Sequence, residues 1–241
     1  MKQTVSEWAE GSYQDQLRRI QDREVRSVLS LCLEEADSIL QSPEQTDFGN
    51  ESFFRHRDQF HELVFGHNGP EDEVWNGLKC NRMHLTRSEY EFIINCHQLH
   101  HFDSVVESGA GETSRLFKRL GCNVLCIESQ EGPWVERAIQ AGATVKLVSF
   151  DPVSSELDPD NLASALQGQP CDLLFVDSPV GTRNRSKVLD SFLRHLEPRF
   201  ILIHDAHRDA QNVYRWMRIF ELKVLEHLPS WRGLVLLTRG K

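Results

Sequence analysis

The sequence predicts an α/β fold in which a seven-stranded, mostly parallel sheet carries helices on both faces. From residue 103 to the C-terminus, short apolar runs alternate with segments of helical periodicity. Near-continuous apolar strands of this kind are typical of parallel sheets that are buried on both faces. The last two apolar runs, 222–228 and 233–238, are separated by little more than PSWR. That gap is short enough for an antiparallel hairpin, so the predicted sheet is mixed.

The first 85 residues show little strand signal. Apolar residues fall at helical spacing over 13–41, Ser42-Pro43 ends this pattern, and a shorter helix is predicted around 53–65. We therefore expect an N-terminal helical extension at 1–85 and a separate α/β domain at 86–241. The extension would either cap the site or form a contact between copies of the chain, which makes a homo-oligomer an open alternative.

The α/β domain is predicted to begin with a helix. Thr86-Arg87-Ser88-Glu89 has the pattern of a capping box, and apolar residues continue to Leu99. Five strands and their connecting helices follow in turn. The expected strands are 104–106, 123–127, 144–150, 173–176 and 200–203, and the expected helices are 112–120, 133–138, 159–167, 186–196 and 210–220.

A glycine turn follows the first strand. Glu107 is followed by Gly109 and Gly111, and then by a helix start. Glycine enters positive φ without penalty and lets a ligand approach the backbone closely. The first amides of the next helix are unpaired donors that suit a polar or anionic group. A ligand site is therefore predicted at this turn, although such a motif alone is often an ordinary turn.

The other strand ends also carry polar side chains. Glu128 ends the second strand, 19 residues after Gly109, where a carboxylate can accept hydrogen bonds from both hydroxyls of a ribose. Phe150-Asp151 could meet an adenine ring and its amino group. Ligands of open parallel sheets bind beyond the carboxyl ends of the strands. Acidic residues at almost every strand end therefore predict a site at this edge, which Asp177, His204 and Asp205 complete.

At these residues the chain resembles the class I S-adenosylmethionine-dependent methyltransferases, over about residues 86–240. VESGAGETS resembles the glycine motif of that family, and IES and SFD resemble its ribose-side and adenine-side segments. LLFVDSPVG and ILIHDAHRD are similar to the fourth- and fifth-strand segments of small-molecule and sugar O-methyltransferases. Ser108 departs from the usual small or apolar residue, and Ser114 replaces the third glycine of a dinucleotide motif.

The resemblance implies a Rossmann-like fold and S-adenosylmethionine as cofactor. It implies O-methylation of a hydroxyl on a small molecule or glycan unit as the activity. The cofactor-binding residues that follow from the motifs are Glu107, Ser108, Gly109, Ala110, Gly111, Thr113, Ser114, Glu128, Phe150, Asp151 and Asp177.

Two chemistries remain open at the fourth and fifth strand ends. Asp177 and Asp205 could hold Mg²⁺, which would lower the pKa of an acceptor hydroxyl. Alternatively His204 or His207 acts as general base, oriented by Asp177 or Asp205. Asp205 could also simply cap a helix at 208–220.

Composition and charge also restrict the partners and the location that we expect for this protein. The net charge of −9 argues against a nucleic-acid partner, and no apolar run approaches the roughly 18 residues of a membrane span. The polar N-terminal stretch lacks the apolar segment of a signal peptide. Six cysteines without a C-x-x-C pair indicate reduced, buried thiols. We therefore expect a cytoplasmic protein without a membrane partner.

Three further functions stay open at this stage. A methyltransferase acting on protein or RNA is one, although the chain lacks the N-P-P-Y or D-P-P-Y motif of amino-group methylation. A catalytically inactive domain that binds the cofactor as a scaffold is another. A nicotinamide-dependent oxidoreductase is disfavoured by Ser114 at the third glycine position.

Overall fold

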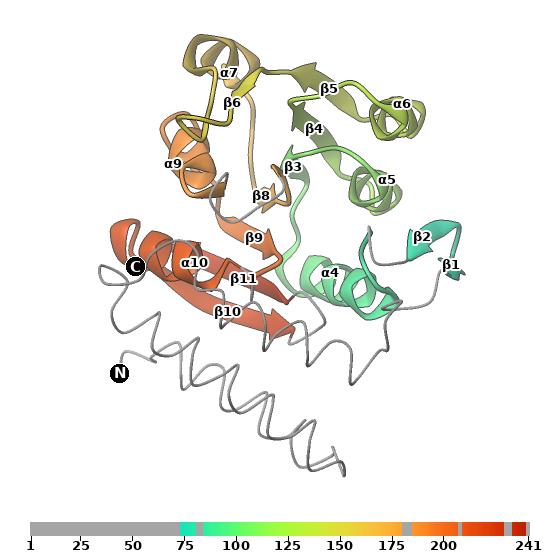
Figure 1. Cartoon of the computed structure of the whole chain (residues 1–241). Helices are drawn as coiled ribbons and strands as arrows, with labels where there is room; N and C mark the ends of the chain where they lie inside the picture. Colours follow the sequence, from blue (N-terminus) through green and yellow to red (C-terminus); the bar gives the residue numbers. More distant parts are fainter. Residues whose placement is uncertain (1–72, 81–83, 180–184, 207–208, 229–232, 240–241) are drawn as a thin grey trace, which may run out of the picture.

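A computed structural model of the chain describes residues 73–80, 84–179, 185–206, 209–228 and 233–239. Its centre is a seven-stranded sheet (Figure 1). Across the sheet the strands are β10 (Leu222–Leu228), β11 (Leu234–Arg239), β9 (Phe200–His204), β8 (Leu173–Val176), β3 (Ser104–Ser108), β4 (Asn123–Glu128) and β5 (Thr144–Leu147).

Strand direction confirms the predicted mixed sheet. The five strands from β5 to β9 pair in parallel. Strand β11 is antiparallel to both of its neighbours, β9 and β10. Because β3 and β8 are adjacent at the centre, the chain after β3 turns towards one edge of the sheet and the chain after β8 towards the other. At such a reversal of strand order, open parallel sheets usually bind their ligands in a crevice at the carboxyl ends of the strands.

Helices cover both faces of the sheet (Figure 1). One hydrophobic cluster joins the sheet to α4 (Arg87–His100), α5 (Glu112–Arg119) and α6 (Pro133–Gln140). A second cluster joins the opposite face to α7 (Pro159–Leu166), α9 (Val188–Leu193) and α10 (Ala210–Ile219). Neighbouring strand residues divide between the clusters: Val105 belongs to the first and Val106 to the second. This alternation explains why the strands read as unbroken apolar runs.

A short hairpin before α4 was missed by the sequence analysis. Strands β1 (Glu73–Trp75) and β2 (Leu78–Cys80) pair antiparallel. Their two-residue turn has φ of 50° at Asn76 and 70° at Gly77, as hairpin turns with the sequence Asn-Gly require. Leu78 and Cys80 are buried in the cluster that contains α5. The rest of the predicted helical extension, residues 1–72 and 81–83, lies outside the described residues.

The third parallel strand is shorter than predicted. It ends at Leu147, and Phe150–Asp151 forms a separate strand, β6, that pairs with β7 (Glu156–Leu157). The backbone oxygen of Ser149 accepts from the amide of Asp158, which draws the chain away from the sheet. Val148 and Phe150 pack with the cluster that contains α7. The amide of Val148 still donates to the backbone oxygen of Glu128 at 2.8 Å, and beyond it the apolar pattern continues because of side-chain burial.

The cysteines of the described residues are reduced, as the sequence predicted. All five cysteines in the described residues carry free thiols, and four of them are buried. Burial raises the pKa of the Cys96 thiol to about 12, so this thiol is unreactive. None of the helices in the described part of the chain has the length and apolar character needed to cross a bilayer.

Candidate active site

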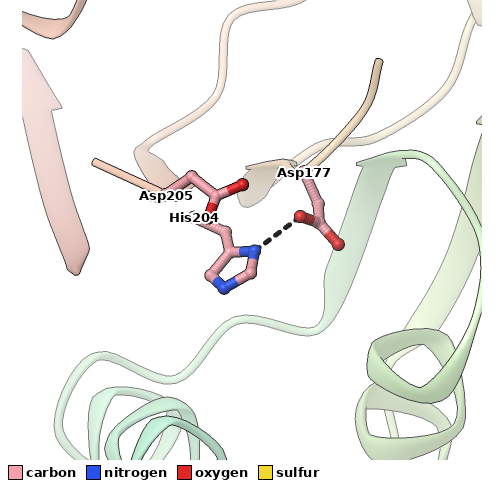
Figure 2. A group of neighbouring side chains, drawn as sticks. All are labelled: Asp177, His204 and Asp205. Carbon is pink, nitrogen blue, oxygen red and sulfur yellow. Dashed lines mark hydrogen bonds and ion pairs between the residues drawn. The ribbon is translucent and has the colours of Figure 1, made fainter. Parts of the chain in front are cut away.

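The carboxyl ends of β3, β8 and β9 meet at the centre of the sheet. Asp177 follows β8, His204 is the last residue of β9, and Asp205 comes next (Figure 2). Asp205 has φ of 58°, the left-handed region that asparagine and aspartate tolerate best among side-chain-bearing residues. The alternation of side chains between the two faces of β9 ends at this residue. One carboxylate oxygen each of Asp177 and Asp205 and one ring nitrogen of His204 all lie within 4.8 Å of one another.

Gly109 joins the glycine turn to this cluster. Its φ is 110°, and its amide donates to the oxygen of Ile127 at 2.8 Å. A Cβ at this position would lie 3.0 Å from the Cβ of Ser178. The backbone oxygen of Ser108 accepts from the amides of both Asp177 and Ser178, at 3.2 and 2.9 Å. The turn after β3 therefore lies directly against the chain that carries Asp177.

Glu107 faces inward beneath helix α5. The hydroxyl of Ser114 donates to its Oε2 at 2.6 Å, the hydroxyl of Thr113 donates to its Oε1, and the thiol of Cys126 lies 3.6 Å from Oε2. The side chains of Glu107, Thr113 and Ser114 thus anchor the first turn of α5 to the end of β3. Ser108 and Gly111 of the same turn are buried, and Ala110 between them is half-buried.

Burial raises the pKa of Glu107 to about 7, against the lowering effect of the Ser114 and Thr113 hydroxyls. A carboxyl whose pKa rises on folding holds its proton more tightly in the folded state. The free energy of unfolding should then fall as pH increases from 4.5, the ordinary value, to about 7, by about 3 kcal/mol.

We expect Glu107→Gln to abolish this pH-dependent part of the free energy of unfolding. Urea unfolding of both proteins at several pH values would measure the difference in their unfolding free energies, in which the other titrating groups cancel. The wild type should lose stability relative to the variant across this window. A difference that stays constant with pH would contradict the role of the Glu107 carboxyl.

Glu128 and Asp151 occupy different environments. Glu128 is buried, and its Oε1 accepts from the amides of Ser129 and Gln130 at 2.7 and 3.2 Å. These bonds fix the carboxylate at the end of β4. Asp151 is exposed, and its oxygens accept from the amides of Val153 and Ser154, which lower its pKa. The Asp151 carboxylate therefore supports a surface turn, and half-buried Phe150 precedes it.

His204 lies between two carboxylates. Its Nδ1 is 2.6 Å from Oδ1 of Asp177, and its Nε2 is 3.9 Å from Oε1 of Glu89 on α4. Burial lowers the pKa of His204, but the charges of Asp177, Asp205 and Glu89 outweigh it and raise the pKa above 6.5. These neighbours favour the protonated form of the ring, and its Nδ1 forms a hydrogen bond with Asp177.

Asp177 is the most accessible acid of this cluster. Its side chain is 33% exposed, against 4% for Asp205 and none for Glu89. Burial raises the pKa of Asp177, but His204 and Arg185 outweigh that effect and lower it. In the described part of the chain no group donates to its second oxygen, Oδ2. Asp177 therefore presents a charged acceptor to the crevice, held from behind by His204.

Arg185 is a fully buried cation behind the same strand ends. Its guanidinium lies 3.5 Å from Oδ1 of Asp177, 3.4 Å from Oδ2 of Asp205 and 3.0 Å from Oδ2 of Asp209. Asp209 is the residue before α10, so the alternative that Asp205 caps this helix is wrong. Arg185 also donates to the backbone oxygen of His204 at 2.8 Å.

The predicted magnesium ligands do not fit a divalent cation in this arrangement. Octahedral ligands at about 2.1 Å from Mg²⁺ lie about 2.9 Å apart. The Nδ1 of His204 and Oδ1 of Asp177 are closer, at 2.6 Å, and share a proton. Asp177 and Asp205, the pair predicted to hold the metal, are instead bridged by Nη2 of Arg185. We therefore derive no catalytic step through a metal.

Three residues of this site were missed or undervalued by the sequence analysis. Glu89 was assigned only to a helix cap; its Oε2 does accept from the amide of Thr86 at 2.7 Å, while Oε1 faces His204. Arg185 was not among the predicted site residues, and it is 1% exposed. Burial lowers the pKa of His84, which lies within electrostatic range of both Glu112 and Asp177. Of the predicted site residues, His207 lies outside the described residues.

No protein-family model matches this sequence, and no curated protein matches it. Several solved structures resemble the fold. CalS11, a TDP-rhamnose 3′-O-methyltransferase of calicheamicin biosynthesis, is 12% identical over 93% of this chain and 99% of its own, with a TM-score of 0.47. A S-adenosylmethionine-dependent methyltransferase from Clostridium acetobutylicum is 10% identical over 79% and 100%, with a TM-score of 0.46. A protein of the NADB-Rossmann superfamily from Streptococcus agalactiae is 12% identical over 65% and 69%, with a TM-score of 0.43.

These similarities are too distant to carry an argument about activity or substrate. The sheet itself defines the class of fold. Its strand order, with an antiparallel β11 inserted between β9 and β10, is the Rossmann-like arrangement with a C-terminal hairpin that the resemblance to class I methyltransferases implied.

Proposed function

We propose that this protein is an S-adenosylmethionine-dependent methyltransferase that methylates a hydroxyl of a small molecule or glycan unit. One observation carries the proposal. The partly exposed carboxylate of Asp177 stands at the end of β8, beside the glycine turn, and is held by two buried side chains, the ring of His204 and the guanidinium of Arg185. A fixed carboxylate beside a cofactor turn is the arrangement that hydroxyl activation needs.

The glycine turn and the end of β4 would hold the cofactor. The backbone of Ser108, Gly109, Ala110 and Gly111 offers close approach, and Gly111 precedes the first turn of α5. The Oε2 atom of Glu128 would accept from ribose hydroxyls, with Phe150 and Asp151 on the adenine side. When bound, S-adenosylmethionine supplies an electrophilic methyl group on a positively charged sulfonium.

Charge at the strand ends favours such a ligand. Four carboxylates, Asp177, Asp205, Asp209 and Glu89, surround the guanidinium of Arg185 and the ring of His204. The excess negative charge reaches the crevice mainly at Asp177, because the other three carboxylates are buried. A fixed negative charge in a partly desolvated crevice attracts a cationic ligand more strongly than it would in water.

Asp177 would accept the proton of the substrate hydroxyl. An aliphatic hydroxyl is a far weaker acid than a carboxylic acid, and the lowered pKa of Asp177 widens the gap. Complete deprotonation before methyl transfer is therefore disfavoured. The hydroxyl would instead donate a hydrogen bond to Oδ2, and its proton would pass to Asp177 as the oxygen takes the methyl group and the carbon–sulfur bond of the sulfonium breaks, which leaves S-adenosylhomocysteine.

His204 has a positioning role in this proposal. The sequence analysis made His204 or His207 the base and an aspartate its orienting partner. The burial of His204 and its two carboxylate neighbours favour the reverse assignment, in which His204 holds Asp177. The acidic net charge of −9 and the free thiols accord with a small-molecule or glycan acceptor and a cytoplasmic location.

Calorimetric titration tests the cofactor directly. We expect the full chain to bind S-adenosylhomocysteine with a dissociation constant in the micromolar range and to bind NADH far more weakly. Binding of NADH without S-adenosylhomocysteine would revive the oxidoreductase alternative. No binding of S-adenosylhomocysteine at high micromolar concentration would overturn the proposed function.

A further inference from the structure

Arg185 occupies the position between the two acids that the sequence analysis assigned to a metal. Its Nη2 lies 3.5 Å from Oδ1 of Asp177 and 3.4 Å from Oδ2 of Asp205. The side chain is 1% exposed, and the two aspartates follow neighbouring parallel strands, β8 and β9. A positive charge of the chain itself therefore already stands where a bridging cation would have to be placed.

Backbone hydrogen bonds hold this guanidinium in place. Its Nε donates to the oxygen of Pro179 and its Nη1 to the oxygen of His204, both at 2.8 Å, and its Nη2 contacts the oxygen of Asp177. Nη1 also donates to Asp209 at 3.0 Å. Displacing Arg185 would leave these oxygens without this donor, which is unfavourable inside a protein.

The planar guanidinium suits this position better than a lysine would. It offers N–H donors along two edges, and here it meets carbonyl groups from the loops after β8 and β9 together with three carboxylates. The same group thus fixes the backbone that carries Asp177 and balances part of its charge. Arg185 acts on the reaction through Asp177, which makes it a positioning residue.

We propose that Arg185 is the resident cation of this site, taking the bridging place of a divalent metal between Asp177 and Asp205. Methyl transfer then needs no added divalent cation. The part concerning methyl transfer rests on the proposed function, but the place of the cation does not. This place of the Arg185 guanidinium predicts that the wild type has no divalent-metal site between Asp177 and Asp205 and that removing the guanidinium creates one.

Manganese binding tests the inference independently of activity. Electron paramagnetic resonance on the full wild-type chain, first dialysed against EDTA, should show only free Mn²⁺ at millimolar concentration. Arg185→Met keeps much of the apolar stem but removes the charge, and it should gain Mn²⁺ binding by at least about tenfold, because two carboxylates lose their partner. Arg215→Met is the matched control, since Arg215 pairs with Asp190 outside the site, and it should gain none.

A positioning role also predicts a change in pH dependence. Arg185 lowers the pKa of Asp177, so the acid limb of the pH–rate profile should move to higher pH in Arg185→Met. Arg185→Lys should restore most of that shift, because it restores the charge. Treatment with EDTA should leave the wild-type rate unchanged.

Stoichiometric Mn²⁺ binding by the wild type that is lost in Asp205→Asn would overturn the inference, as would loss of activity in EDTA that Mg²⁺ restores. The wild-type measurements decide the matter even if Arg185→Met does not fold. Failure of S-adenosylhomocysteine to bind would overturn only the proposed function, because Mn²⁺ binding does not depend on that cofactor.

Discussion

Asp177→Asn should lower kcat for methyl transfer by about 10²–10⁴-fold, the usual contribution of a positioned acid–base group. The amide cannot take the proton of the acceptor hydroxyl. It also leaves the ring of His204 and the guanidinium of Arg185 without one of their carboxylates. Steady-state kinetics with labelled S-adenosylmethionine would measure the loss, and calorimetry should show binding of S-adenosylhomocysteine, which lacks the sulfonium charge, within a few-fold of the wild type.

Asp190→Asn is the matched control for this substitution. Asp190 is a carboxylate of α9 that pairs with Arg215 at 2.9 Å, away from the glycine turn. We expect its kcat to equal that of the wild type. Unchanged turnover in Asp177→Asn would favour either another base or a catalytic role for His84, which lies within electrostatic range of Asp177. No turnover by either protein with any hydroxyl acceptor, despite cofactor binding, would favour the scaffold alternative.

Gly109→Ala should weaken binding of S-adenosylhomocysteine by at least about tenfold, or 1.4 kcal/mol. A side chain at φ of 110° is strained, and its Cβ would lie 3.0 Å from the Cβ of Ser178. Relief of that contact must move either the glycine turn or the chain that carries Asp177. Isothermal titration and thermal unfolding of the same preparation would separate lost binding from lost stability.

Gly168→Ala provides the control for backbone strain alone. Gly168 also has positive φ, 68°, but a Cβ there meets nothing within 4 Å. Each variant should lose stability of about 1 kcal/mol from the backbone conformation. Only Gly109→Ala should lose affinity for the cofactor product. Equal affinities in the two variants would show that the glycine turn does not hold the ligand.

Much of the fold could be predicted because buried parallel strands appear in the sequence as unbroken runs of apolar residues. Val105 and Val106, on opposite faces of β3, must both be apolar, and polar residues mark the point where each strand leaves the core. The end of β5 could not be placed by this signal, since Val148 and Phe150 are apolar for packing outside the sheet. The Asn76-Gly77 hairpin carried a recognisable turn signal that was overlooked.

The candidate site was predicted in outline but not in its roles. Strand ends identify Asp177, His204 and Asp205 as neighbours, yet spacing says nothing about which side chain reaches the crevice. Burial of His204 and exposure of Asp177 depend on α4, whose Glu89 is far away in the sequence. Arg185 lies in a segment after Asp177 with no periodic pattern, so its insertion between two strand ends left no sequence signal.

A crystal structure of the full chain with S-adenosylhomocysteine, grown with Mg²⁺ present, tests the central claim most directly. The proposal predicts the homocysteine part on the backbone of Gly109 and Gly111, the ribose hydroxyls on Glu128, and the sulfur facing the carboxylate of Asp177. It also predicts the guanidinium of Arg185 between Asp177 and Asp205, with no metal there. A ligand bound away from the glycine turn, with Asp177 remote from its sulfur, would contradict the claim.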